Sequence, residues 1–292
     1  MSTRLEDTQK VISYLDLYRH MITARELDAL ENELMKRGEA FFHVSGAGHE
    51  GIAALAPHLT PHDWLHVHYR DKALMLARGV TPESLFLGLF GKDRSSSRGR
   101  QMCAHISEPA LKILASPGPV GNGALQAAGV ASVVKNDPER PIVLCALGDG
   151  MTQEGEVIEA IGHAVRDGLP VLFLIEDNSY AISTKTGGRT FFSLPEGPAD
   201  SFYSLPITRI DGCDIPAALE AFGGLVRGMR EDRKPRIAVF EVERLTNHTN
   251  ADDHRVYRSE EEIRRIAETS DPIAHLKKLL LEQGADEADL EE

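Results

Sequence analysis

The residues best suited to chemistry follow two apolar segments near the middle of the chain. Residues 142–147 form an apolar run that ends in Gly148-Asp149-Gly150, and a second run, 171–175, leads through acidic residues to Asn178. Such runs are typical of parallel strands that are buried on both faces. Apolar residues at helical spacing lie between the runs and stop at Gly168. The pattern therefore predicts a strand–helix–strand unit with oxygen-bearing side chains at both strand ends.

These oxygen-bearing residues predict a magnesium and phosphate site. Ligands in open α/β sheets bind at the carboxyl ends of the strands. The Asp149 carboxylate, the Asn178 amide oxygen and the backbone carbonyl of Tyr180 form an all-oxygen set that suits Mg²⁺. Gly148 and Gly150 let backbone N–H groups approach a phosphate closely. A Gly-Asp-Gly sequence alone also suits an ordinary turn, but the 27 residues between it and Asn178, with both ends on buried strands, favour the site.

The segment from Gly148 to Asn178 resembles the diphosphate and metal motif of thiamine diphosphate enzymes. The wider pattern resembles the alpha subunit of the first, decarboxylating component of 2-oxo acid dehydrogenase complexes, from about Tyr14 to Gly284. Three further blocks carry this resemblance, and the second and third are most similar to the branched-chain, 2-oxoisovalerate branch. The blocks are His68-Tyr69-Arg70, then Gly99-Arg100-Gln101-Met102 with His105, then Asn247-His248 with Asp252-Asp253 and Tyr257-Arg258-Ser259.

The resemblance implies a three-layer α/β/α thiamine diphosphate-binding fold with a mostly parallel sheet. We expect one domain over residues 1–292, with a helical extension over 1–40 and a frayed acidic tail over 285–292. The apolar pattern places a helix over 6–37 and a short helix that ends near Pro57. It predicts strands over 207–210 and 237–242, and further helices at 124–134, 215–229, after Thr81, after Ser259 and after Asp271.

The resemblance also implies thiamine diphosphate and Mg²⁺ as cofactors. Arg70 has the forked donors that phosphate oxygens accept, although a surface ion pair with a nearby acid is the simpler alternative. Val120, in a turn rich in glycine and proline, is the expected contact of the aminopyrimidine ring. The full cofactor set is Tyr69, Arg70, Val120, Gly148, Asp149, Gly150, Met151, Asn178, Tyr180 and His248, with Asp149, Asn178 and Tyr180 as metal ligands.

His248 is the candidate catalytic residue, because it follows strand 237–242 on the same edge of the sheet as Asp149. A histidine there would titrate near neutral pH and could donate to a diphosphate or move a proton. The alternative is a solvated histidine paired with Asp252 or Asp253. Ser45 and His49 are weaker candidates, since a turn and a helix cap explain them equally well. Four histidines between residues 58 and 68 lack the spacing of a zinc site.

Several positions depart from the family pattern. Glu176 stands where the branched-chain branch has a basic residue, and an acid there would repel a diphosphate unless it points away or pairs with a base such as Arg70. Asp177 replaces the first asparagine of a pair, Asn247 replaces the first histidine of a pair, and Thr249 stands where animal relatives have a serine that is phosphorylated. The departure at Glu176 concerns cofactor affinity rather than the fold.

The function implied is that of an alpha subunit of a 2-oxo acid dehydrogenase, favouring branched-chain substrates. Its partners would be a beta subunit in an α₂β₂ assembly and a lipoyl-bearing acyltransferase that accepts the acyl group. The alternatives are an acetoin dehydrogenase alpha subunit and a non-catalytic assembly subunit with a decayed site. A nicotinamide-binding protein is disfavoured, because no G-x-G-x-x-G follows an early strand.

Composition supports a cytoplasmic enzyme with no nucleic-acid or membrane partner. The net charge of −13 disfavours binding to nucleic acids and to anionic membranes. The three cysteines are scattered, which indicates a reducing compartment. The first residues lack an apolar signal core, and no run approaches the length of a membrane span.

Overall fold

A six-stranded sheet organises the chain. The computed structural model describes residues 13–114 and 116–291. The strand order is β1-β2-β3-β10-β9-β8, and all pairs are parallel except β8 with β9. The mostly parallel sheet expected from the sequence is therefore present. Its strands are β1 (Trp64–His66), β2 (Val143–Gly148), β3 (Val171–Asp177), β8 (Ser201–Phe202), β9 (Leu205–Asp211) and β10 (Arg236–Glu241).

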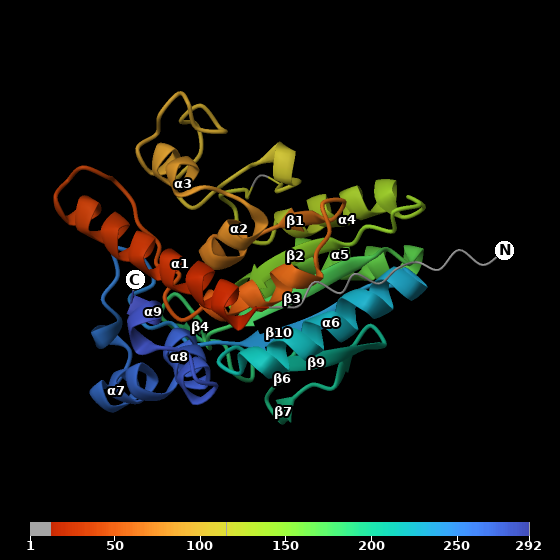
Figure 1. Cartoon of the computed structure of the whole chain (residues 1–292). Coiled ribbons are helices and arrows are strands. Elements are labelled where there is room, and N and C mark those ends of the chain that lie inside the picture. Colours follow the sequence, from red (N-terminus) through yellow and green to blue (C-terminus); the bar gives the residue numbers. More distant parts are fainter. Residues whose placement is uncertain (1–12, 115, 292) are drawn as a thin grey trace.

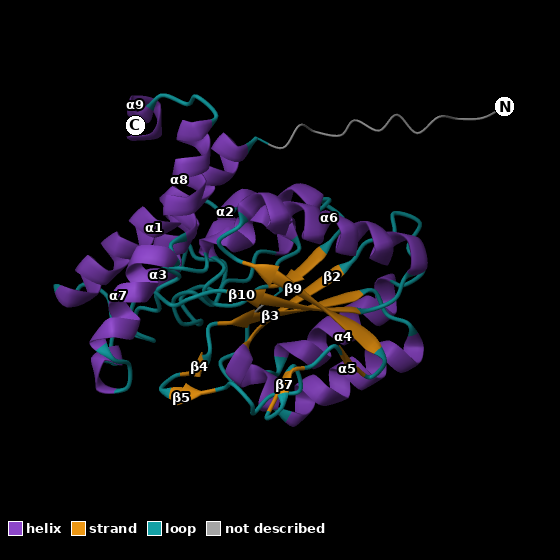
Figure 2. Ribbon diagram, turned by 90° about the horizontal axis from the view of Figure 1, so that it is seen from below, coloured by secondary structure: helices purple, strands orange, loops and turns teal. Residues whose placement is uncertain are grey.

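Helices cover both faces of this sheet (Figure 2). On one face lie α4 (Gly123–Val134) and α5 (Gly155–Asp167), and on the other lie α1 (Tyr14–Lys36), α2 (Lys72–Arg78), α6 (Ile215–Asp232) and the 3₁₀ helix η1 (Glu50–His58). Alternate side chains of β2 enter different cores: Leu144 packs toward α1 and α6, whereas Cys145 packs toward α4 and α5. Burial on both faces explains why the strands read as continuous apolar runs.

The remaining helices are shorter and lie outside the central layers. The helices α3 (Pro82–Leu89) and α7 (Glu260–Thr269) begin after the caps Thr81 and Ser259, whose side chains accept backbone N–H groups in the first turn. Figure 1 shows α7, α8 (Pro272–Glu282) and α9 (Glu287–Glu291) gathered beside α1. Among the described residues, no helix is long and apolar enough to cross a membrane.

Short 3₁₀ turns and hairpins complete the chain between these elements. The turns are η2 (Pro109–Leu111), η3 (Asp149–Gln153) and η4 (His254–Val256). The hairpins pair β4 (Tyr180–Ala181) with β5 (Thr184–Lys185), and β6 (Ser193–Leu194) with β7 (Gly197–Pro198).

Two expectations at the chain ends have different outcomes. The acidic tail expected to be frayed is helical over residues 287–291, because Leu290 is buried against the core beside α1 and α8 and holds the segment in place. That expectation is wrong for those residues. The first helix begins at Tyr14 in the structure, and the expected start near Glu6, with Val11, lies outside the described residues.

Candidate functional site

The carboxyl ends of β2 and β3 bring the predicted site residues together. These strands are parallel neighbours, with Gly148 in register with Glu176, so Asp149 and Asn178 both lie directly beyond the same edge of the sheet. A cavity of about 220 Å³ opens there. Every residue that the sequence analysis assigned to the cofactor or the metal lines it, and the structure adds three more. The lining residues are His68, Tyr69, Arg70, Val120, Gly148, Asp149, Gly150, Met151, Asn178, Tyr180, Ala181, Ile182 and His248.

Asp149 is held rigidly at one side of this cavity. Its side chain is buried, and each carboxylate oxygen accepts one hydrogen bond: Oδ1 from the Gly150 N–H at 2.9 Å and Oδ2 from the Thr186 hydroxyl at 2.6 Å. The next residue has no room for a side chain, because a Cβ on Gly150 would lie 2.6 Å from the Cβ of Ala181. This close packing fixes the turn after β2 against the β4–β5 hairpin. No motif in the sequence predicts the hydrogen bond from Thr186 to Asp149.

Asn178 and Tyr180 offer oxygens to the same cavity in different ways. The Asn178 side chain is buried, and its Oδ1 accepts the Tyr180 N–H at 3.3 Å. The Tyr180 side chain points away: its hydroxyl donates to Glu262 at 2.9 Å, and the Arg258 guanidinium lies 4.6 Å from the ring centroid. Tyr180 therefore presents its backbone rather than its phenol to the cavity. This arrangement suits the predicted use of its carbonyl as a metal ligand.

Two arginines form the cationic side of the site. The Arg70 guanidinium is buried and donates to the backbone carbonyls of Ser45 and His248. Arg244 is fully buried and donates to the Ile182 carbonyl at 3.0 Å and to the Tyr257 hydroxyl at 2.7 Å. Within the described part of the chain, neither arginine has a carboxylate within ion-pair distance. Buried cations without a counter-ion are costly, so this pair is suited to an anionic ligand.

His248 lies between the two arginines and is neutral. Its Nδ1 receives N–H donors from Arg70 at 3.0 Å and from Arg244 at 3.1 Å, so the ring proton must be on Nε2. Burial, together with the positive charges of Arg70 and Arg244, lowers the pKa of His248 to about 4. The expectation that this histidine titrates near neutral pH is therefore wrong for the ligand-free site. The Asp252 carboxylate accepts the backbone N–H of His248 at 2.8 Å and the Tyr257 hydroxyl at 2.6 Å, rather than a proton from the His248 ring.

Glu176 faces away from the cavity and does not pair with Arg70. Its carboxylate is fully buried, and Oε2 lies 2.5 Å from Nδ1 of His49. Burial raises the pKa of Glu176 to about 7. Burial and the nearby charge of Glu176 also raise the pKa of Asp71 well above its usual range. Repulsion of a diphosphate would be avoided if Glu176 pointed away from it or paired with a base. In the structure, the side chain points away.

The weaker candidates lie behind or beside the cavity. The His49 ring is fully buried, and its Nε2 lies 3.3 Å from Nδ2 of Asn178. Burial and the charge of Arg70 lower the pKa of His49 to about 3, so this ring is also neutral. The hydroxyl of Ser45 donates to Asp28 at 2.5 Å and does not line the site. The His105 ring stacks on Tyr69 with the ring centroids 6.2 Å apart.

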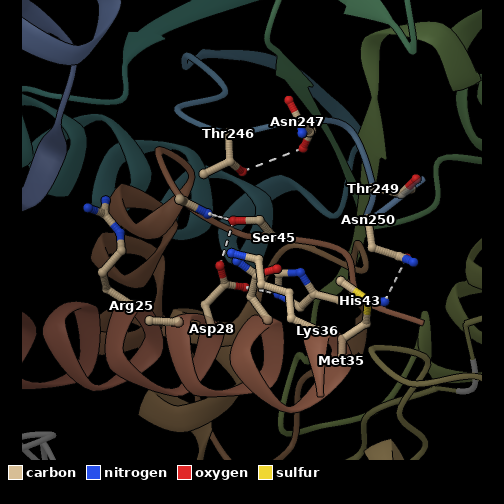
Figure 3. A pocket seen from close by; sticks show the side chains of 13 residues that line it. Arg25, Asp28, Met35, Lys36, His43, Ser45, Thr246, Asn247, Thr249 and Asn250 are labelled. Atoms are coloured by element: carbon tan, nitrogen blue, oxygen red, sulfur yellow. Dashed lines mark hydrogen bonds and ion pairs between the residues drawn. The ribbon is translucent and has the colours of Figure 1, made fainter. Parts of the chain in front are cut away.

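A second cavity, of about 440 Å³, lies between α1 and the loops that contain Ser45 and residues 246–250 (Figure 3). Asp28 from α1 is the buried acid on its floor, and with Glu31 and His43 it forms a group that could hold a metal. Lys72 already occupies the position of a cation there, since its ammonium lies 3.1 Å from Asp28 and 2.6 Å from Glu31. This group therefore joins α1 to α2 as a buried ion cluster.

Two sets of groups thus meet at the carboxyl edge of the sheet. Asp149, Asn178 and the Tyr180 carbonyl provide hard oxygen ligands, and Arg70, Arg244 and the Nε2–H of His248 provide donors without an anionic partner among the described residues. The backbone of the glycine-flanked turn adds a close approach for a phosphate. The donor set fits a diphosphate bound with Mg²⁺. The fold and the site define an α/β protein that brings oxygen ligands and cationic donors together at its strand ends.

Comparison with known proteins agrees with this class. The chain matches the family model for the dehydrogenase E1 component over residues 18–292, and it belongs to that family. It is 31% identical to the 3-methyl-2-oxobutanoate dehydrogenase subunit alpha of Mycobacterium tuberculosis, over 94% of this chain and 72% of that protein. It is 29% identical to the mitochondrial 2-oxoisovalerate dehydrogenase subunit alpha 1 of Arabidopsis thaliana, over 92% of this chain but only 57% of that protein.

Relatives named as pyruvate dehydrogenase subunits have a sequence identity close to that of the branched-chain relatives. The mitochondrial pyruvate dehydrogenase E1 component subunit alpha of Dictyostelium discoideum is 27% identical over 92% of this chain and 70% of that protein. Family membership therefore does not by itself select the 2-oxo acid.

Proposed function

We propose that this chain is the alpha subunit of a thiamine diphosphate-dependent 2-oxo acid dehydrogenase. The observation that carries the proposal is the cavity that Asp149, Asn178, Arg70 and His248 line together, with Arg244 behind it on Nδ1 of His248. When bound, the cofactor would supply the carbanion chemistry that decarboxylates a 2-oxo acid. The protein's contribution is to bind that cofactor, to orient it and to exclude water from it.

Each side chain has a role that follows from its position. Asp149, Asn178 and the Tyr180 carbonyl would hold Mg²⁺, whose charge would offset that of the diphosphate. Arg70 and Arg244 would neutralise the phosphate oxygens, and the neutral His248 would donate through Nε2. The glycine-flanked turn after β2 would let a phosphate approach the backbone closely. Tyr69 and Val120, which also line the cavity, would contact the organic part of the cofactor.

The composition of the cavity supports a requirement for a second subunit. Asp149 is the only carboxylate among the described residues that line it, and in this proposal it would ligate the metal. The family's beta subunit supplies the carboxylate that activates the aminopyrimidine. We therefore propose an α₂β₂ assembly, which passes the acyl group to a lipoyl-bearing acyltransferase. A proton transfer by His248 during that step requires the bound cofactor to raise the pKa of the ring, since burial and two arginines hold it low.

Branched-chain 2-oxo acids are the favoured substrates, because two of the relatives above are named for them. Acetoin and pyruvate remain alternative substrates. The non-catalytic alternative rested on repulsion between Glu176 and a diphosphate, and that carboxylate is turned onto His49 instead.

Calorimetry on the chain co-expressed with a candidate beta subunit tests the proposal. We expect thiamine diphosphate to bind only when Mg²⁺ is present, and we expect turnover with branched-chain 2-oxo acids to exceed turnover with pyruvate or acetoin. Assembly without any cofactor binding would contradict the proposed function and would favour the non-catalytic subunit. Higher turnover with acetoin or pyruvate would support the cofactor site but contradict the proposed branched-chain substrate.

A further inference from the structure

The buried contact between His49 and Asn178 bears on how a metal would bind. An asparagine side chain has two ends of nearly equal size, and only its carbonyl oxygen can ligate a cation. Rotation of the Asn178 amide by half a turn would present N–H donors to the metal and abolish that bond. The site therefore needs something that keeps the amide in one orientation.

Hydrogen-bond polarity along three side chains provides this constraint. The Glu176 Oε2 atom lies 2.5 Å from Nδ1 of His49, so the carboxylate accepts the Nδ1–H and fixes the neutral tautomer. The other ring nitrogen, Nε2, is then an acceptor only. It lies 3.3 Å from Nδ2 of Asn178 and accepts an amide N–H. A flipped amide would place its oxygen against the Nε2 lone pair, which is repulsive.

The backbone favours the same orientation of the Asn178 amide from the other side. Its Oδ1 accepts the N–H of Tyr180 at 3.3 Å, which leaves the second lone pair of this oxygen available. The side chains of Glu176, His49 and Asn178 are all buried, so water does not compete for these hydrogen bonds. Neither His49 nor Glu176 lines the cavity itself.

We propose that His49 is a positioning residue, held in one tautomer by Glu176, that keeps the Asn178 oxygen directed to the metal. Contacts of this kind orient the residues that ligate a metal, and their removal typically weakens metal binding by about 10–100-fold. The inference deepens the proposed function and rests on it. It also gives Glu176, the main departure from the family pattern, a defined task behind the site.

Two matched substitutions of His49 distinguish a role in orienting the Asn178 amide from a role in filling space. The amide of His49→Gln places polar atoms near Nε2 and keeps an acceptor for Asn178. The shorter His49→Asn places its amide near Nδ1, so it keeps a donor for Glu176 and loses the contact with Asn178. Both variants would be purified as the assembly with the beta subunit. Binding of Mn²⁺, as a spectroscopic substitute for Mg²⁺, would be titrated by electron paramagnetic resonance with saturating thiamine diphosphate.

We expect His49→Gln to bind Mn²⁺ within about threefold of the wild type, and His49→Asn to bind at least about tenfold more weakly. Equal affinities in the two variants, whether high or low, would overturn the positioning role. A second pair covers the case in which His49→Asn fails to assemble. Glu176→Gln still accepts the Nδ1–H, whereas Glu176→Met cannot, so only the Met variant should lose affinity; equal affinity in this pair would also overturn the role.

The same titration distinguishes this inference from the proposed function. If the wild-type assembly binds no Mn²⁺ with the cofactor, the proposed function fails and the positioning role fails with it. If the wild type binds Mn²⁺ and Asp149→Ala does not, the metal site stands. Wild-type affinity in His49→Asn would then refute the positioning role alone.

Discussion

Substitution of Gly150 by alanine should damage the site through one steric contact. A Cβ at this position would lie 2.6 Å from the Cβ and 3.3 Å from the Cα of Ala181, whereas carbon atoms pack best at about 3.5–4.0 Å. The backbone φ of Gly150 is not positive, so the contact rather than strain sets the cost. Overpacking of this kind costs about 1–3 kcal/mol. Relief of this contact must move either the turn that contains Asp149 or the β4–β5 hairpin. Each of these segments contains a proposed metal ligand.

The magnitude can be measured against a matched control in the same segment. A Cβ on Gly155, at the start of α5, meets nothing within 4 Å, so Gly155→Ala should be neutral or stabilise by up to about 1 kcal/mol. Gly150→Ala should lower the thermal midpoint by roughly 2–12 °C, given about 2–4 °C per kcal/mol for a chain of this class. It should also weaken Mg²⁺-dependent binding of thiamine diphosphate in calorimetry. Identical melting and binding in the two variants would refute the steric reasoning.

Three further outcomes follow from the charges at and near the site. His248→Ala should reduce acyl transfer to the lipoyl acceptor by roughly a hundredfold at saturating cofactor, and weaken cofactor binding less than Asp149→Ala does; wild-type turnover would exclude a catalytic role for this histidine. Arg70→Gln should raise the calorimetric Kd for thiamine diphosphate by about 10–100-fold, since a hydrogen bond to a charged group contributes about 1.5–3 kcal/mol, and an unchanged Kd would exclude the phosphate role. Burial lowers the pKa of His66 to about 4. The free energy of unfolding should therefore be highest above pH 6.5 and should fall by up to about 3 kcal/mol as the pH drops from 6.5 toward 4. The sign follows because the unfolded chain binds the proton first; denaturation curves of His66→Gln that follow the wild type at every pH would argue against it.

The central strands and the two candidate ligands at their ends were predictable from local pattern. Residues 142–147 and 171–175 are buried on both faces, so nearly every position is apolar and the strand ends are marked by polar residues. Adjacent parallel strands must then place Asp149 and Asn178 side by side. No long-range information was needed for this step.

The supporting residues were not predictable, because their partners are distant in sequence. His49 and Glu176 are 127 positions apart, and nothing in either segment indicates that they meet. Arg244 follows β10 in a loop whose sequence gives no sign that its guanidinium is fully buried. The tail around Leu290 has an acidic composition that predicts fraying, and a single buried leucine outweighs it.

The most direct test of the metal–diphosphate assignment is the Mg²⁺ dependence of thiamine diphosphate binding in Asp149→Ala. The control is Asp93→Ala, which removes an exposed carboxylate with the same change in charge. Both variants would be titrated calorimetrically as the assembly with the beta subunit, with and without Mg²⁺. We predict that Asp93→Ala binds as the wild type does, and that Asp149→Ala loses the Mg²⁺-dependent affinity while keeping its fold. Mg²⁺-dependent binding by Asp149→Ala at wild-type affinity would contradict the assignment.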